Sequence, residues 1–106
     1  MVAEITAPEL DARRASGKGP VVLDVREAWE LDIARLPDVL HIPMAQVPSR
    51  LGELDPASEI VVMCRSGGRS MQVALFLSRN GFQSVANLTG GILAWSRDVD
   101  PSINQY

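Results

Sequence analysis

The sequence predicts an α/β fold in which helices cover both faces of a mainly parallel sheet. The run 60–63 is short, continuous and apolar, and the run 21–25 is interrupted only by Asp24, which is typical of strands buried on both faces. The segment 70–80 has a wide apolar face at helical spacing and ends at Gly81, a residue type that commonly terminates helices. Because strands and helices alternate along the chain, the connections are expected to be parallel crossovers.

The individual elements follow from local signals. A capping box over Thr6–Glu9 with proline in the first turn predicts the first helix. Trp29 and Ile33 lie four residues apart, as in a short helix, and Gly90-Gly91 predicts a tight turn before the last helix. In chain order we expect a helix at 7–16, a strand at 21–25, a helix at 27–33, a strand at 39–42, a helical segment at 47–54, a strand at 60–63, a helix at 70–80, a strand at 82–88 and a final helix containing 92–95.

Length and composition limit the class of protein. The chain has 106 residues, which predicts a single domain over 1–106 with a core of its own. One Cys and one His exclude an intrachain disulfide, a cysteine-rich zinc site and a multi-histidine metal centre. The net charge of −3 and the lack of a basic run argue against a nucleic-acid partner. With no apolar run long enough for a membrane span and no targeting signal, we expect a cytoplasmic protein with no membrane association.

The segment Cys64–Ser70, with the sequence Cys-Arg-Ser-Gly-Gly-Arg-Ser, concentrates the chemistry. A lone Cys after an apolar strand is more often a core residue than a nucleophile, but this context favours the nucleophile. Gly67 and Gly68 allow the loop to curl its N–H groups around the sulfur, and the following helix points its positive end at the same place. Arg65 and Arg69 add positive charge, so we expect a lowered thiol pKa and an anion-binding cradle.

This segment resembles the active-site loop of rhodanese-type sulfurtransferases. Three further segments resemble the same family in the same order: Leu-Asp-Val-Arg-Glu at 23–27, Asn-Gly-Phe at 80–82 and Leu-Thr-Gly-Gly-Ile-Leu-Ala-Trp at 88–95. The resemblance implies a three-layer α/β/α rhodanese-like fold with a mainly parallel five-stranded sheet. It also implies that Cys64 is catalytic, that no metal or cofactor is needed, and that the substrate is bound by Arg65, Ser66, Gly67, Gly68, Arg69 and Ser70.

The reaction implied by the resemblance has two steps. Cys64 takes the outer sulfur of thiosulfate or of a persulfide donor and holds it as a persulfide. Cyanide, a thiol or a sulfur-carrier protein then accepts that sulfur. Because the chain has no second Cys, the accepting group has to come from another molecule.

Two alternatives remain open from the sequence. The first is a rhodanese-like module without catalytic activity that binds a partner or senses oxidants. The second is a cysteine phosphatase or arsenate reductase, but the related enzymes of that type place five residues between Cys and Arg. Only four separate Cys64 from Arg69, and the tighter loop suits a terminal sulfur atom better than a phosphate.

Residues outside the loop have mainly structural interpretations. The family usually has Gly-His-Ile-x-Gly-Ala where this chain has 34–39, so its usual histidine is absent, and His41 is interpreted as a packed or capped strand residue. Asp24 either caps a backbone N–H or, with Arg26, reaches the loop. Trp29 and Trp95 are expected to pack in the core or at its rim.

Overall fold

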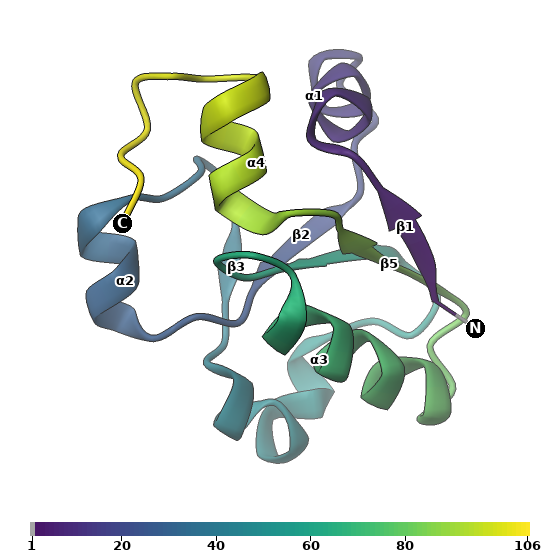
Figure 1. Cartoon of the computed structure of the whole chain (residues 1–106). Coiled ribbons are helices and arrows are strands. Elements are labelled where there is room, and N and C mark those ends of the chain that lie inside the picture. The colour runs from purple at the N-terminus through teal and green to yellow at the C-terminus, as the bar shows by residue number, and fades with distance from the viewer. Residues whose placement is uncertain (1) are drawn as a thin grey trace.

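The computed structural model describes residues 2–106 and contains a five-stranded sheet in which all paired strands are parallel (Figure 1). The strand order is β1-β5-β4-β2-β3. The strands are β1 (Ala3–Ile5), β2 (Val21–Asp24), β3 (Leu40–His41), β4 (Glu59–Met63) and β5 (Ser84–Leu88). Because β4 is the middle strand, the residue that follows it, Cys64, lies at the centre of the carboxyl edge of the sheet. The predicted mainly parallel sheet is confirmed.

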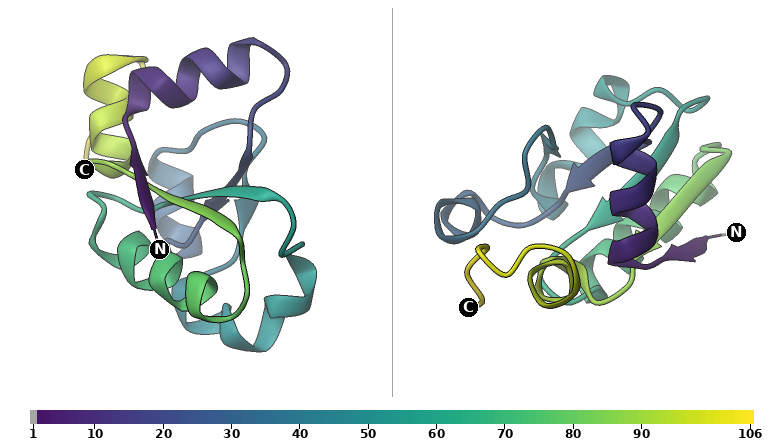
Figure 2. Two further views of the ribbon diagram at one scale, coloured as in Figure 1. Left: turned by 90° about the vertical axis from the view of Figure 1, so that its right-hand side faces the viewer. Right: turned by 90° about the horizontal axis from the view of Figure 1, so that it is seen from above.

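Helices cover both faces of this sheet. The helices α1 (Ala7–Ala15) and α4 (Gly91–Asp98) lie on one face. The other face is covered by α3 (Gly68–Arg79) and by two 3₁₀ helices, η1 (Met44–Gln46) and η2 (Pro48–Glu53). Figures 1 and 2 show the sheet between these two layers, with the short helix α2 (Ala28–Ile33) beside the C-terminal segment. The three-layer α/β/α arrangement is therefore confirmed.

Alternation along β4 decides which way the Cys64 side chain points. Val61 and Met63 pack into the cluster that contains residues of α1 and α4. Val62 and Cys64 pack into the other cluster, with residues of α3. Because successive side chains of a strand face opposite sides, the thiol is directed to the side on which α3 begins.

Two elements differ from the expectation. No strand was predicted before residue 7, yet Ala3–Ile5 pairs with β5, with Ile5 opposite Leu88. The expected helical segment 47–54 is instead two 3₁₀ helices that begin at Met44, with a kink at Arg50 (φ −113°, ψ 17°). Pro48 lacks the N–H that a continuous α-helix would need at that point.

Helix α2 presents a different face to the protein than its pattern indicates. Trp29 and Ile33 are 60% and 39% exposed, whereas Glu30 and Leu31 are buried. The ring of Trp29 packs edge-on against that of Tyr106, at 6.4 Å between centroids, so Trp29 is a rim residue, while Trp95 lies in the core. The side of α2 that faces the protein thus carries a carboxylate, that of Glu30.

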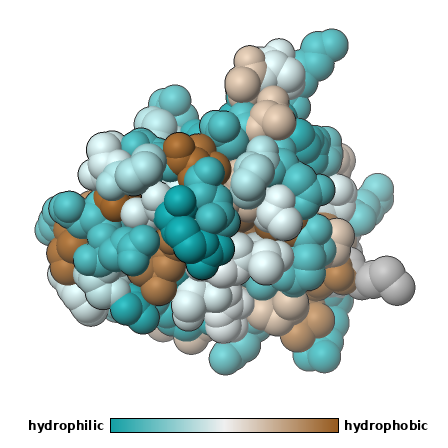
Figure 3. Space-filling view, turned by 45° about the horizontal axis from the view of Figure 1, so that its top comes forward, coloured by the Kyte–Doolittle hydropathy of each residue, from teal (hydrophilic) through white to brown (hydrophobic). Residues whose placement is uncertain are grey.

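The outer surface is mixed in polarity. On the side where α1 and α4 lie, hydrophobic side chains form separate small patches among hydrophilic ones (Figure 3). Within residues 2–106, no helix is both long enough and apolar enough to span a membrane.

Candidate active site

The Cys64 sulfur lies against the amino end of α3. The side chain is 1% exposed, and its Sγ accepts hydrogen bonds from the backbone N–H of Gly67 at 3.1 Å and of Ser70 at 3.4 Å. Gly67 caps the helix with φ +111°, a left-handed conformation that favours glycine and turns its N–H toward the sulfur. The helix begins at Gly68, two residues before the predicted start, so Arg69 and Ser70 lie in its first turn.

A hydroxyl and an amide complete the surroundings of the sulfur. The Ser70 Oγ lies 3.3 Å from Sγ and 2.5 Å from Oδ1 of Asn87 in β5. The Nδ2 of Asn87 donates to the carbonyl of Gly67 at 3.3 Å. Asn87 therefore holds both ends of the turn that surrounds Sγ. Asn87 was not among the predicted site residues, although a buried amide within the apolar strand Val85–Leu88 is a signal of a polar partner nearby.

These contacts favour the thiolate. Burial raises the pKa of Cys64, but the Ser70 hydroxyl and the backbone N–H groups of Ser70, Gly67 and Ser66 outweigh it, so the pKa lies below its ordinary value. Hydrogen bonds to the charged form of a group stabilise that form. The expected lowering of the thiol pKa is therefore supported, with backbone and hydroxyl donors as its cause.

The amino end of α4 supports the loop from behind. The backbone N–H of Ile92 donates to the carbonyl of Cys64 at 3.0 Å, and that of Leu93 donates to the carbonyl of Arg65 at 3.2 Å. Gly91 has φ +59°, and a Cβ on it would lie 2.4 Å from the Arg65 carbonyl oxygen. The predicted tight turn at Gly90-Gly91 is confirmed, and it lets α4 approach the loop backbone closely.

The two loop arginines are engaged by neighbours. Arg69 makes a paired contact with Glu30 of α2, from Nη1 to Oε2 at 2.7 Å and from Nη2 to Oε1 at 2.8 Å. Arg65 donates through Nε to the main-chain oxygen of Tyr106 at 2.6 Å, and its guanidinium lies 5.3 Å from the centroid of the Tyr106 ring. Among the described residues, no guanidinium donates a hydrogen bond to Sγ. Arg65, Ser66 and Gly68 are the exposed residues of the loop.

Asp24 and Arg26 form a buried ion pair. Both side chains are fully buried, with Nη2 of Arg26 2.8 Å from Oδ2 of Asp24, and Asp24 also accepts from the backbone N–H of Arg26. Asp24 thus caps a backbone N–H, the first of its two interpretations. His41 Nε2 lies 2.7 Å from the carbonyl oxygen of Arg26, which confirms its interpretation as a capped strand residue.

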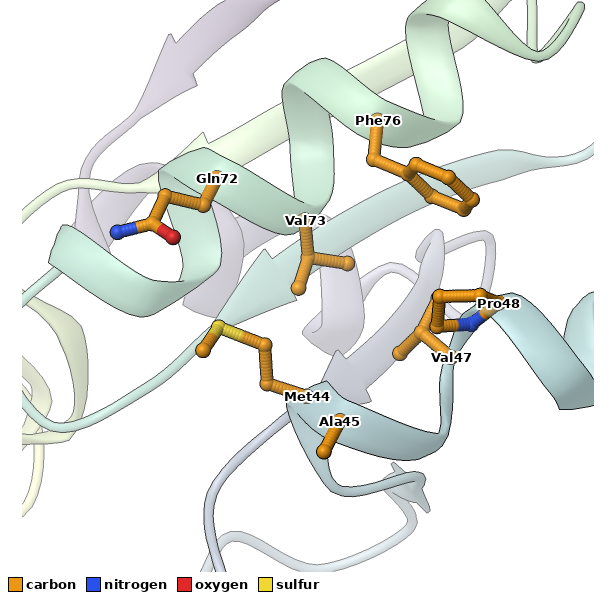
Figure 4. A pocket seen from close by; sticks show the side chains of 7 residues that line it. All are labelled: Met44, Ala45, Val47, Pro48, Gln72, Val73 and Phe76. Carbon is orange, nitrogen blue, oxygen red and sulfur yellow. The ribbon is translucent and has the colours of Figure 1, made fainter.

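A further apolar pocket lies outside this loop. It has a volume of about 260 Å³ and is formed between α3 and the two 3₁₀ helices (Figure 4). The pocket is lined by Met44, Ala45, Val47, Pro48, Gln72, Val73 and Phe76. None of these belongs to the Cys64 loop. Within residues 2–106, no group of three or more His, Cys, Asp or Glu side chains is arranged to hold a metal ion.

Comparison with known proteins agrees with this geometry. The sequence model of the family described as Rhodanese-like domain matches residues 6–98. The chain belongs to the rhodanese-like domain family. A protein of Allochromatium vinosum named Sulfurtransferase is 38% identical over 103 residues, covering 97% of this chain and 96% of that protein. An Arabidopsis thaliana Rhodanese-like/PpiC domain-containing protein is 47% identical over 89 residues, which cover 80% of this chain and 30% of that protein.

Solved structures match over the same extent. The crystal structure of a rhodanese-like domain protein from Staphylococcus aureus has a TM-score of 0.85 and 28% identity, and the match covers 99% of both chains. The predicted family and fold are thus confirmed. The family and its sulfurtransferase relative support sulfurtransferase activity of the rhodanese type in general.

In this rhodanese-like domain, the divergent segment 34–39 contributes side chains to the hydrophobic core. In the segment 34–39, where the family's usual histidine is absent, Ala34 and Leu36 are buried in the cluster on the α1 and α4 side. An apolar side chain therefore anchors the connection between α2 and β3.

Proposed function

We propose that this protein is a sulfurtransferase that carries a sulfane sulfur on Cys64, from thiosulfate or a persulfide donor to an external thiophilic acceptor. The observation that carries the proposal is the set of donors around Sγ: two backbone N–H groups and one hydroxyl at the start of α3. Such a cradle stabilises a thiolate and, once a sulfur is added, the negative charge on the outer sulfur.

The first step is a displacement at sulfur. The Cys64 thiolate attacks the outer sulfur of thiosulfate, a new S–S bond forms, and the old S–S bond breaks with its electron pair leaving on sulfite. The product is a Cys64 persulfide anion. Because the thiol is almost completely buried, the terminal atom of a donor is the part expected to reach it.

The second step regenerates the enzyme. Cyanide, a thiolate or the terminus of a sulfur-carrier protein attacks the outer sulfur of the persulfide, and the electron pair of the breaking S–S bond returns to Cys64. We propose that Arg65, Ser66, Gly67, Gly68, Arg69 and Ser70 form the substrate-binding loop around this sulfur. As the chain holds one Cys, the acceptor is external.

Intact-protein mass spectrometry after incubation with thiosulfate tests the proposal. We expect the wild type to gain one sulfur atom and to release it as thiocyanate when cyanide is added, and Cys64→Ser to gain none. A wild type that gains no sulfur and forms no thiocyanate contradicts the proposal and leaves a binding or redox-sensing module. Hydrolysis of an aryl phosphate that depends on Cys64 would instead indicate a phosphatase.

A matched pair of glycine variants tests the role of the cradle. Gly67 and Gly81 bracket α3, both have positive φ, and a Cβ on either meets no atom closer than 3.6 Å. Each change to Ala is expected to cost about 1–2 kcal/mol of stability, because both force a left-handed residue. Only Gly67→Ala should slow persulfide formation, since only that residue directs an N–H to Sγ.

A further inference from the structure

The charge of Arg69 is paired at the rim of the Cys64 loop. Arg69 is the second residue of α3, so its side chain begins beside the cradle. Both terminal nitrogens of the guanidinium contact Glu30, and the Arg69 and Glu30 side chains are 32% and 4% exposed. A two-pronged contact of this kind fixes the orientation of both groups. The guanidinium is therefore bound to a carboxylate of the protein itself.

Glu30 is held in place by contacts other than Arg69. Its Oε2 accepts from the backbone N–H of Glu27 at 2.9 Å, and its Oε1 accepts from the hydroxyl of Tyr106 at 2.8 Å. That hydroxyl in turn accepts from Nη1 of Arg26 at 2.8 Å. The hydrogen bond from Arg69, helped by those from Glu27 and Tyr106, lowers the pKa of Glu30 to about 2 against the opposing effect of burial. The carboxylate is thus charged at neutral pH.

The connected cluster has no net charge. It contains two carboxylates, Asp24 and Glu30, and two guanidiniums, Arg26 and Arg69, linked through the hydroxyl of Tyr106. Pairing with Glu30 reduces the net positive field that Arg69 exerts at the sulfur. The direct donors to Sγ are backbone N–H groups and the Ser70 hydroxyl.

We infer that Glu30 is a specificity-determining residue, which neutralises Arg69 and thereby lowers the preference of the site for doubly charged sulfur donors relative to singly charged ones. The inference rests on the proposed sulfurtransferase function. Coulomb attraction scales with the product of the charges, so neutralising one cation removes twice as much attraction from a dianion as from a monoanion. Thiosulfate belongs to the first class, and a thiosulfonate (RSO₂S⁻) or a persulfide (RSS⁻) belongs to the second.

Thiosulfate and methanethiosulfonate are matched probes of this difference. With either donor, the Cys64 thiolate bonds to the outer sulfur and the S–S bond of the donor breaks. The electron pair leaves on sulfite in one case and on methanesulfinate in the other. The transferred atom and the attacking group are the same, and the departing groups differ by one unit of charge.

The test compares the two donors in Glu30→Gln and the wild type. The quantity measured is the ratio of kcat/KM for thiosulfate to kcat/KM for methanethiosulfonate, with cyanide as acceptor and thiocyanate as product. We expect this ratio to rise about fivefold in Glu30→Gln at low ionic strength and to approach the wild-type ratio as salt screens the charge. Asp32→Asn, which removes an exposed carboxylate from the same helix, should change the ratio less than twofold.

Two further variants separate charge from structural support. Tyr106→Phe removes a hydrogen bond from Glu30 but keeps its charge, so the donor ratio should stay at the wild-type value even if both rates fall. Arg69→Gln leaves the Glu30 charge without its partner, and the ratio should fall about fivefold. If Glu30→Gln does not fold, the donor ratio measured in Arg69→Gln tests the inference in its place.

The outcomes distinguish this inference from the proposed function. If the wild type produces no thiocyanate from either donor, the sulfurtransferase proposal fails. If both donors work and the ratio is the same in the wild type, Glu30→Gln and Arg69→Gln, the inference is overturned while the proposed function stands. If the donor ratio shifts by the same factor in Tyr106→Phe as in Glu30→Gln, the effect is structural, and the inference is overturned.

Discussion

The turn from β4 into α3 and the turn from β5 into α4 begin in the same way and have different roles. Each enters its helix through a left-handed glycine, Gly67 in the first turn and Gly90 in the second. At the first helix, N–H groups face the Cys64 sulfur. At the second, the N–H groups of Ile92 and Leu93 donate to carbonyls of the Cys64 loop. One helix start thus serves the chemistry, and the other fixes the backbone that carries it.

The two turns are also held by different forces. Side chains from other elements hold the first turn, through the contacts of Ser70 with Asn87 and of Arg69 with Glu30. Close approach of backbones holds the second, which only glycine permits at position 91. We therefore expect the first turn to respond to pH and to polar substitutions, and the second to respond to side-chain volume.

The largest effect is expected from a change in the second turn. In Gly91→Ala, the added Cβ would lie 2.4 Å from the Arg65 carbonyl oxygen and 2.5 Å from that of Cys64, at a residue with φ +59°. We expect a loss of roughly 4 kcal/mol in the free energy of unfolding, from backbone strain and overpacking together. Urea denaturation followed by circular dichroism measures it.

Gly17→Ala is the control for this change. Gly17 has a similar φ of +78°, but a Cβ on it meets no atom within 4 Å. Only the backbone strain of about 1–2 kcal/mol is then expected. Equal losses in the two variants would mean that the contact between α4 and the loop does not depend on glycine.

A smaller effect is expected from acid at the first turn. The pKa of Glu30 is about 2 in the folded protein, below its ordinary value of 4.5, because of its contact with Arg69. A lowered folded-state pKa means that the contribution is complete above pH 4.5 and is lost as the pH falls toward 2. Its size is on the order of 3 kcal/mol, at about 1.4 kcal/mol per pKa unit.

Urea midpoints measured between pH 7 and pH 3 test this expectation. The wild type should lose more stability over this range than Glu30→Gln, because the other carboxylates are common to both proteins. Parallel pH profiles would show that the ion pair does not anchor the first turn.

The smallest effect concerns the sulfur itself. Ser70→Ala removes the hydroxyl near Sγ, which is the leading cause that lowers the pKa of Cys64. We expect the pKa of Cys64 to rise, because the thiolate loses a hydrogen bond that stabilises the charged form. The midpoint of the pH dependence of alkylation by iodoacetamide gives this pKa.

Ser66→Ala provides the comparison for that experiment. Ser66 contributes a backbone N–H to the lowering of the Cys64 pKa, and the substitution keeps that group. The midpoint should therefore match that of the wild type. A shift of the same size in both variants would indicate a general change of the loop rather than the loss of one donor.

Much of the fold was predictable because its signals are local. The capping box at Thr6 and the glycine after α3 mark helix ends within a few residues, and the apolar runs of β2 and β4 identify buried strands. Strand β1 was missed because three residues carry no pattern of their own, and pairing with β5 is what orders them. The short helix α2 was predicted from the spacing of Trp29 and Ile33, but that spacing did not reveal that Glu30 and Leu31 are its buried residues.

The sequence by itself determined the candidate nucleophile, the loop around it and the family, because the residues from Cys64 to Ser70 are contiguous and their chemistry is local. The tertiary structure alone decided which groups surround that loop. Glu30, Asn87 and Tyr106 come from α2, β5 and the segment after α4, and folding brings these three parts of the chain together around the loop that follows β4. Charge pairing and burial depend on that meeting, so a sequence that shows two free arginines folds into a site where one of them is already neutralised.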